Sequence, residues 1–435
     1  MVPHSYIFDP EMECIPRDRL RELQNKRLRN VVKRCYQNME MYQDKFREAG
    51  ISPEDIRSVD DLPKIPFTTK EDLRSRYPMN GLVAVPREEI LRIHMTTGTT
   101  GQPTVSPLTK DDIFREEIVL AKCGAALGIG PGDTVQMMFG YGLFAGSILL
   151  HPALERLLGA SIIPIGAAAP SATQLDIMRD FRPKVACATP SFFLHIIEVA
   201  KDKGIEVDKL GIKGIITGAE ASSEETRLKI SRAFGDAAYM DIYGLCELGP
   251  HFCVECQEHQ GMHFCEEAFI PEVIDPVTGE TLKPGEPGML VVTCMTKDAM
   301  PILRYQTKDI TVLDDSNCAC GRTHIRMRRP TGRTDDMIKV KGVNIFPSQI
   351  ESVVRNIEEV KDSEFQMLVD RSAKAVDMLT VKIEASEESG ELQKKLKAEF
   401  QRVFLGANFN VELVEIGSLP RFTHKAKRIV DTRKL

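Results

Sequence analysis

The sequence predicts an α/β protein with a large N-terminal domain and a separate C-terminal domain. At 435 residues the chain exceeds the usual size of one hydrophobic core, so two or three domains are expected. Between residues 90 and 241 short β-rich runs alternate with helical stretches, which predicts helices packed around a mostly parallel sheet. A segment rich in Gly, Arg, Lys and Asp at residues 331–346 precedes a second αβ pattern, which indicates a further domain of about 100 residues.

Each element follows from its local pattern. From Arg17 to Glu48 apolar residues recur at helical spacing among charged ones, which predicts an amphipathic helical region that ends near the break at residues 50–53. The strands expected in the parallel sheet are residues 135–139, 161–164, 185–189 and 214–217. After Tyr243 shorter strands and turns, among them residues 288–292 and 310–313, predict a change of sheet class. The elements expected in the C-terminal domain are residues 348–357, 365–369, 378–385 and 388–404.

Composition narrows the class of protein. Hydrophobic residues make up 42% and charged residues 28%, as in ordinary globular proteins, and the net charge of -6 argues against a dedicated nucleic-acid binder. The N-terminus lacks the pattern of a signal peptide, and no stretch is apolar over about 18 residues, so we expect a cytoplasmic protein without a membrane partner. In such a chain the eleven cysteines are expected to be buried thiols or metal ligands.

A threonine- and glycine-rich segment is the first motif that indicates chemistry. Residues 96–101 contain four threonines and two glycines, so successive N–H and O–H donors can surround the oxygens of a polyphosphate. No Gly-Lys-Ser/Thr follows, so the segment is not a Walker loop. The alternative interpretation is a surface loop.

A second glycine-rich segment, residues 140–146, follows an expected strand and superficially suggests a dinucleotide fingerprint. Its spacing is one residue too long for that pattern. Its aromatic residues are instead expected to line an apolar pocket, although such residues are also ordinary core. The pocket set is Phe139, Tyr141, Gly142 and Phe144.

Two further segments carry groups that suit a magnesium nucleotide. Tyr243 could stack on a base, and Glu247 could hold a magnesium ion against phosphates. Arg304 and Asp309 flank the end of an expected strand, where a carboxylate can accept both hydroxyls of a ribose. Taken alone, a surface ion pair explains the second segment equally well.

These segments in their order, together with residues 332–342, resemble the adenylate-forming superfamily of acyl-CoA synthetases and related ligases. Residues 301–305, 342–347 and 425–428 resemble the phenylacetate-CoA ligase branch specifically, and the similarity runs from about residue 10 to the C-terminus. The resemblance implies layered mixed sheets with a small β-barrel-like part in an AMP-binding and acyl-acid domain, residues 1–333. It also implies a mobile α+β C-terminal domain, residues 334–435, that carries the catalytic lysine.

The resemblance also assigns roles to individual residues. Lys425 and Glu247 would be catalytic, with Glu247 serving Mg²⁺, and Asp335 would be the hinge. The implied nucleotide-binding residues are Thr96, Thr97, Gly98, Thr99, Thr100, Gly101, Gly218, Ala219, Glu220, Asp241, Tyr243, Gly244, Asp309 and Arg333.

The implied reaction joins a carboxylic acid to coenzyme A in two steps. ATP first converts the acid into an acyl-adenylate with release of pyrophosphate, and the thiol then displaces AMP. Phenylacetate is the first substrate expected, and indoleacetate or another aryl acid could also fit. Two alternatives stay open: transfer to an amine or carrier thiol, and a nucleotide-binding regulatory protein with lost catalysis, which Cys246 and His424 suggest because the family usually has Thr and Gly there. A homodimer is a weak expectation from the family.

A cluster of cysteines and histidines suggests a structural zinc site. Thiolates and imidazoles at short local spacings suit tetrahedral zinc. By resemblance the four ligands would be Cys256, His263, Cys318 and Cys320, and either Cys253 or His259 could replace one of them. Four protein ligands would close the site, so zinc would hold two segments together and would not activate water. Unliganded buried thiols are the alternative.

Overall fold

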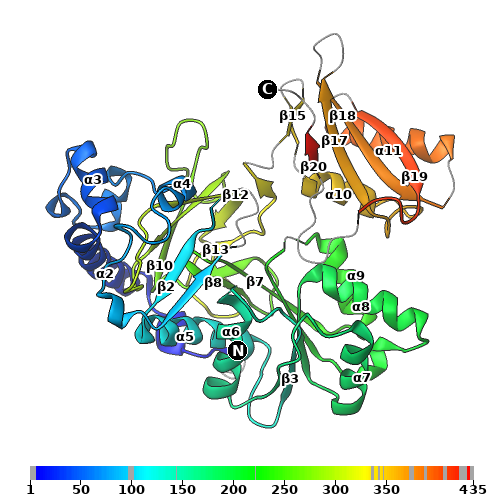
Figure 1. Cartoon of the computed structure of the whole chain (residues 1–435), viewed down its shortest axis with the longest axis horizontal. Helices are drawn as coiled ribbons and strands as arrows, with labels where there is room; N and C mark the ends of the chain where they lie inside the picture. Colours follow the sequence, from blue (N-terminus) through cyan, green and yellow to red (C-terminus); the bar gives the residue numbers. More distant parts are fainter. Residues whose placement is uncertain are drawn as a thin grey trace. The chain divides into compact units, whose positions relative to one another are not determined.

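The chain divides into two compact units in the computed structural model (Figure 1). The first consists of Met1–Ala219 and Ile230–Arg329, and the second of Glu220–Lys229 and Pro330–Leu435. The structure describes residues 6–96, 102–143, 145–220, 222–334, 338–340, 343–345, 347–371, 377–386, 389–404, 409–420 and 429–431.

A parallel sheet forms one half of the first unit, as the alternating pattern predicts. Its strands run in the order β4-β3-β5-β6-β7, and every neighbouring pair is parallel. The strands are β3 (Thr134–Met137), β4 (Ser161–Ile163), β5 (Val185–Cys187), β6 (Gly214–Thr217) and β7 (Ala238–Leu245). All four predicted strands are confirmed.

Helices cover both faces of this sheet because its strands are apolar on both sides. Ile216 faces a core shared with α5 and α6, whereas its neighbour Ile215 faces a core shared with α7, α8 and α9. The helices are α5 (Lys110–Ala126), α6 (Ala145–Pro152), α7 (Ser171–Phe181), α8 (Pro190–Asp202) and α9 (Glu224–Ala233). The π-helical turn η5 (Ala153–Leu157) follows α6.

The sheet changes class after β7, as predicted at Tyr243. From β7 onward the order is β8-β9-β13-β12-β11-β10, and every neighbouring pair is antiparallel. The strands are β8 (Gly249–Glu255), β9 (Met262–Phe264), β10 (Phe269–Ile274), β11 (Pro287–Cys294), β12 (Tyr305–Asp314) and β13 (Arg326–Met327). A separate hairpin consists of β1 (Arg92–Met95) and β2 (Val105–Leu108).

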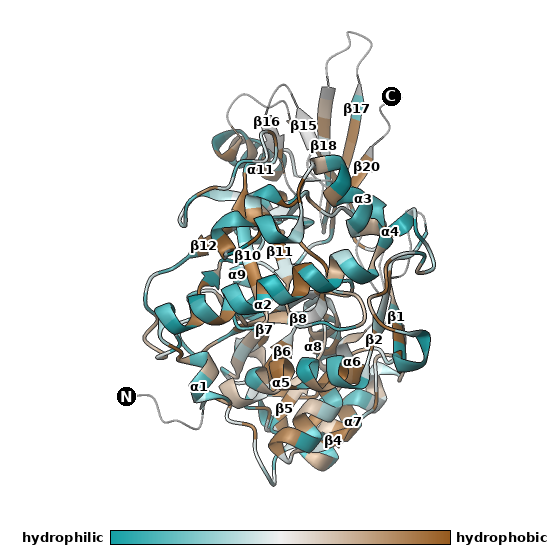
Figure 2. Ribbon diagram, turned by 90° about the vertical axis from the view of Figure 1, so that its left-hand side faces the viewer, coloured by the Kyte–Doolittle hydropathy of each residue, from teal (hydrophilic) through white to brown (hydrophobic). Residues whose placement is uncertain are grey.

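Helices form the N-terminal part of the chain. The predicted helical region is interrupted at Met39, whose backbone is extended and whose side chain is fully buried. It ends at Gly50, which has a left-handed φ of 65° that glycine adopts readily. In α2 apolar residues recur along one buried face, and hydrophilic and hydrophobic segments alternate along it in Figure 2. The helices are α1 (Pro10–Glu13), α2 (Arg17–Asn38), α3 (Glu40–Ala49) and α4 (Lys70–Arg74), with short 3₁₀ turns η2 (Pro53–Asp55), η3 (Val59–Lys64), η4 (Arg87–Glu89) and, later in the chain, η6 (Val207–Leu210).

The second unit has the α+β composition that the sequence predicts. Its sheet runs β19-β18-β17-β20, with β17 and β18 antiparallel and the outer pairs parallel. Phe400 stacks on Phe409 in the core between helix and sheet. The elements are β14 (Gly332–Arg333), β15 (Ile338–Val340), β16 (Val343–Ile345), α10 (Pro347–Arg355), β17 (Phe365–Arg371), β18 (Asp377–Ala385), α11 (Gly390–Val403), β19 (Phe409–Glu415) and β20 (Ile429–Asp431).

Among the described residues no helix has both the length and the apolar character needed to cross a bilayer.

Candidate functional site

The threonine motif lies in the connection between β1 and β2. At its base the N–H of Thr104 donates to Thr96 Oγ1 at 3.0 Å, and the N–H of Thr96 donates to the carbonyl oxygen of Thr104 at 3.0 Å. The two hydroxyl groups lie 3.1 Å apart. The base of the loop is therefore a closed hydrogen-bonded ring. Thr97, Gly98, Thr99, Thr100 and Gly101 lie outside the described residues.

Glu247 lies beside this base. Its Oε1 accepts a hydrogen bond from Thr104 Oγ1 at 2.8 Å and one from Tyr305 Oη at 3.4 Å, and the carboxylate is 4% exposed. Among the described residues, these contacts reach Oε1 and leave Oε2 for another partner. The structure thus places a buried carboxylate beside the hydrogen-bonded pair Thr96 and Thr104 at the base of the motif. The adjacent Cys246 is half-buried, and burial, with the Glu247 charge as the second cause, raises the pKa of its thiol to about 12.

Lys70 is a site residue that the sequence interpretation missed. Its Nζ lies 3.7 Å from Glu247 Oε1. It begins α4, a short helix whose N-cap is Thr69, and no recognisable motif surrounds it. Its position depends on the preceding residue, because Thr68 exchanges main-chain hydrogen bonds with Arg304 and Gln306.

Arg304 is buried next to this segment. The surface ion pair, which the sequence alone favoured as much as a ribose-binding role for Asp309, is therefore not what the structure has. It is 3% exposed, and Glu272 accepts two hydrogen bonds from its guanidinium at 3.0 and 2.9 Å. The remaining donors reach the carbonyl oxygens of Pro63 and Ile65, and the guanidinium stacks over the ring of Phe67 at 4.1 Å. Arg304 thereby fixes residues 63–68 against β12.

Tyr243 and Asp309, predicted for the base and the ribose, meet directly. Tyr243 Oη donates to Asp309 Oδ2, and the tyrosine ring meets Phe252 edge-on. Burial raises the pKa of Tyr243, and the Asp309 carboxylate raises it further. The phenol therefore stays protonated and donates to Asp309. Gly244 follows Tyr243 where the pairing of β7 with β8 shifts register.

The segment after β6 has backbone requirements that explain its residues. A Cβ on Gly218 would lie 2.8 Å from Ile242 Cγ1 and 3.0 Å from its carbonyl oxygen, so only glycine fits against β7. Ala219 has a left-handed φ of 69°, and Glu220 is the first residue of the second unit. Asp241 points inward: its Oδ1 accepts from the N–H of Ile242 at 3.1 Å and lies 3.3 Å from Thr217 Oγ1.

The predicted acid pocket is partly described. Tyr141 Oη lies 3.0 Å from His151 Nδ1, and the two rings meet edge to face. Gly166 packs against the other side of this ring, where a Cβ would lie 3.3 Å from Tyr141 Cδ2. Tyr141 is thus held by two elements, while Phe139 packs on the core beneath α5 and α6. Gly142 is exposed, and Phe144 lies outside the described residues.

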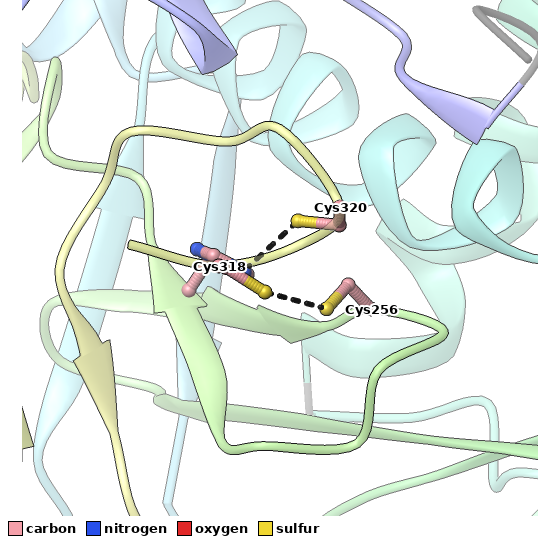
Figure 3. Close-up of side chains that lie close together, drawn as sticks. Cys256, Cys318 and Cys320 are labelled. Carbon is pink, nitrogen blue, oxygen red and sulfur yellow. Dashed lines mark hydrogen bonds between the residues drawn. The ribbon is translucent and has the colours of Figure 1, made fainter. Parts of the chain in front are cut away.

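The four predicted metal ligands come together. Cys256 follows β8, His263 lies on β9, and Cys318 and Cys320 lie in the loop after β12, with all four buried and their ligand atoms within 4.8 Å of one another. Figure 3 shows the three thiol groups turned toward one another. The Cys256 and Cys318 sulfurs are 3.7 Å apart, and Cys320 Sγ is 3.4 Å from His263 Nε2. A tetrahedral zinc would separate two sulfurs by about 3.8 Å and sulfur from nitrogen by about 3.6 Å.

The surroundings prepare these groups for a metal. The carbonyl oxygen of His324 lies 3.1 Å from His263 Nδ1 and can accept a hydrogen bond from its N–H, which directs Nε2 to the thiols. The pKa of Cys320 is lowered because the Cys256 and Cys318 thiols and His263 surround it. The two open alternatives turn elsewhere, since Cys253 Sγ contacts Met327 Sδ at 3.4 Å and His259 Nδ1 lies 3.6 Å from Glu255 Oε1.

Three predicted residues belong to the C-terminal part of the chain. Arg333 lies on β14 in the second unit and is half-buried. Asp335 and Lys425, like the noted His424, lie outside the described residues.

Comparisons with known proteins match nearly the whole chain. Residues 18–295 match the family described as AMP-binding enzyme, and residues 342–433 match the AMP-binding enzyme C-terminal domain. The phenylacetate-coenzyme A ligase of Thermus thermophilus is 40% identical over 98% of this chain and 100% of its own length. The one from Escherichia coli is 38% identical over 98% of both chains. A crystal structure of 2-hydroxyisobutyryl-CoA ligase in complex with 2-HIB-AMP has a TM-score of 0.90 and 28% identity, over 99% of this chain and 93% of that chain. The chain therefore belongs to the AMP-binding enzyme family, in the branch of the phenylacetate-coenzyme A ligases.

Proposed function

We propose that this AMP-forming acid-coenzyme A ligase takes an aryl acid as its substrate, with phenylacetate as the first candidate. A carboxylate oxygen attacks the α-phosphorus of ATP and pyrophosphate leaves. The thiol of coenzyme A then attacks the acyl carbonyl carbon, and AMP leaves as the thioester forms. The observation that carries the adenylation step is the hydrogen bond from Thr104, at the base of the threonine loop, to Glu247, because it joins the proposed phosphate-binding motif to the proposed magnesium-binding carboxylate.

The nucleotide would lie along the ends of β6, β7 and β12. Tyr243 and Asp309 are hydrogen-bonded neighbours, which supports a nucleoside that contacts both, with the base on the ring and the ribose on the carboxylate. Ala219 and Gly244 would leave space for the base, and Gly218 would let this segment pack closely against β7 beside it. Thr96–Gly101 would hold the phosphates. We assign Glu220, Asp241 and Arg333 to the same site, and Asp241 would act by fixing the main chain of β7 next to Tyr243.

Glu247 would hold Mg²⁺ through its Oε2. The ion would neutralise charge on the phosphates, and the protein supplies Thr104, Tyr305 and Lys70 to fix the other oxygen. Lys425 would approach the forming acyl-phosphate bond, and a lysine placed there would offset the repulsion between the carboxylate and the α-phosphate. Asp335 would be the hinge that removes Lys425 before the thiol attacks.

The acid pocket would be formed by Phe139, Tyr141, Gly142 and Phe144. Fixation of the Tyr141 ring by His151 and Gly166 supports a flat apolar substrate, since a rigid aromatic wall selects by shape. Indoleacetate and other aryl acids are the next substrates to test.

We further propose one structural zinc ion at Cys256, His263, Cys318 and Cys320. The donor set and its spacing fit tetrahedral zinc. The ion would join the loop after β12 to β8 and β9. We also place the functional domain boundary between residues 333 and 334. We propose a cytoplasmic location from the sequence pattern and a homodimer from the family resemblance, which fractionation and light scattering would test.

Pyrophosphate release with ATP and Mg²⁺ across aryl, alkyl and amino acids, each with and without coenzyme A, tests the function. We expect release with an aryl acid and a thioester product when coenzyme A is present. Release without thioester would point to an amine or carrier thiol as acceptor, and no release with any acid would favour the regulatory alternative.

Lys425→Ala should lower adenylation by orders of magnitude while thioester formation from supplied acyl-adenylate persists; equal loss in both steps would contradict its role.

A further inference from the structure

A buried lysine lies directly behind the candidate magnesium carboxylate. Lys297, in the loop between β11 and β12, is 4% exposed. Its ammonium group donates to the main-chain carbonyl oxygen of Glu247 at 3.0 Å and to Ser106 Oγ at 2.7 Å. Ser106 lies on β2, two residues after Thr104, whose hydroxyl donates to the Glu247 carboxylate. One ammonium group therefore connects Glu247 to the strand that leaves the threonine loop.

We propose that Lys297 is a positioning residue for adenylation, which holds the main chain of Glu247 in register with β2 so that Thr104 and the Glu247 carboxylate face the same phosphates. This proposal rests on the phosphate-binding and magnesium-binding roles proposed for the loop and for Glu247. Lys297 contacts the main chain of Glu247 and not its carboxylate, so it would act through the orientation of that residue.

The energetics favour such a role over simple stabilisation. Among the described residues no carboxylate lies within ion-pair distance of Lys297, and the atoms that accept hydrogen bonds from its ammonium group are neutral oxygens. Burial raises the pKa of the nearby Glu116 carboxyl to about 8 although the Lys297 charge lowers it, so Glu116 is largely neutral at pH 7. A buried ammonium without a charged partner costs stability, and an apolar side chain of similar length would usually be better tolerated. Its position against Glu247 gives that cost a function.

The geometry also explains why both contacts are needed. β1 and β2 form a two-stranded sheet of their own, and His94 pairs with Ser106 in its ladder. The hydrogen bonds of Thr104 and Ser106 thus attach this small sheet to the turn that carries Glu247. Loss of the Lys297 bridge would leave the carboxylate contact of Thr104 as the remaining link among those described here.

The test compares Lys297→Met with Lys297→Arg and with Lys122→Met. Lys122 is an equally buried lysine that pairs with Glu267, away from Glu247, so its loss controls for removing a buried ammonium group. Pyrophosphate release is measured at varied Mg-ATP and varied acid, and thioester formation is measured from supplied acyl-adenylate. Far-UV circular dichroism quantifies the folded fraction of each variant.

We expect Lys297→Met to lower kcat/KM for Mg-ATP by about tenfold or more, the usual effect of losing a group that orients a metal ligand. KM for the acid and the thioester step should change little. Lys297→Arg should recover most of the loss, and folded Lys122→Met should have wild-type kinetics despite lower thermal stability. Equal loss in both half-reactions, or no change for Mg-ATP, would overturn the role. If the wild type releases no pyrophosphate, the proposed function fails instead, and Mg-ATP affinity from ligand-induced thermal shifts still decides the proposal: equal shifts for wild type and Lys297→Met would reject it.

Discussion

The buried ion pair of Arg304 and Glu272 offers a quantitative test of how the site is supported. The two side chains are 3% and 7% exposed, and two hydrogen bonds of 3.0 and 2.9 Å join them. In Arg304→Met the carboxylate of Glu272 would stay buried without its cation, and the carbonyl oxygens of Pro63 and Ile65 would each lose a donor. Breaking a buried pair from one side costs about 3–5 kcal/mol.

The double variant, in which Arg304 and Glu272 are both methionine, separates the energy of their interaction from the cost of each single substitution. With both partners replaced by methionine, no buried charge is left unpaired, so the cost should fall well below the sum of the two single changes, by a coupling of about 0.5–3 kcal/mol. Urea unfolding followed by far-UV circular dichroism measures this, since the chain has no Trp for fluorescence. Lys209→Met, which removes an exposed pair with Glu206, is the matched control and should leave the midpoint unchanged.

Enzyme kinetics provide a second measurement on the same variants. Arg304 fixes residues 63–68, and this segment leads into Lys70 beside Glu247. Arg304→Met should therefore also weaken the binding of Mg-ATP at temperatures where the protein is folded. A single variant as stable as the wild type, or a double variant that costs the full sum, would refute the ion-pair reasoning. Unchanged Mg-ATP kinetics would refute the link to Lys70.

Three further predictions address the charges and the metal. Lys70→Gln should raise KM for Mg-ATP by about fivefold in pyrophosphate release, because a partly exposed ion pair is worth about 1 kcal/mol; an unchanged KM would remove Lys70 from the site. The pKa of Glu116 is raised from 4.5 to about 8, so the folded protein keeps a proton that the unfolded chain loses between these values, and wild-type stability should fall by about 1.4 kcal/mol per pH unit as pH rises through this window. Glu116→Gln should lack this slope in urea unfolding at pH 5.5 and 7.5, and parallel profiles would contradict the assignment. Purified protein should contain about one zinc per chain, and Cys318→Ser with Cys320→Ser should remove the metal and lower the melting temperature; full stability without metal would exclude the site.

Much of the fold could be predicted because local sequence patterns determine its strands and helices. Apolar runs such as Gly214–Thr217, separated by helical stretches, require a sheet covered on both faces, and the structure has that sheet. The break of the N-terminal helical region at Met39 could not be predicted, because neither glycine nor proline marks it. Met39 is extended there while its side chain is buried, which is a tertiary effect.

The site divides along the same line. The spacing of thiols and imidazoles suggested a metal site, and the family resemblance supplied the four candidate ligands, whereas only the fold shows that Cys318 lies beside Cys256. Arg304 gave no such signal, because its partner Glu272 lies 32 residues away in the sequence. The sequence therefore could not distinguish a buried, structural ion pair from one at the surface. Lys70 lay outside every motif.

The residues to which sequence reasoning gave a role are those expected to contact ligands, and the residues whose role it missed hold those side chains in place. A ligand constrains the chemistry of its contacts, so hydroxyl, carboxylate and thiol groups recur in recognisable patterns around it. A supporting residue is constrained only by the shape of its surroundings. Lys297 and Arg304 are both buried cations that donate hydrogen bonds to main-chain carbonyl oxygens, and a carbonyl oxygen is present at every residue. No sequence pattern can therefore mark such a contact, and variants of Lys297 and Arg304 are the experiments for which the structure, and not the sequence, is needed.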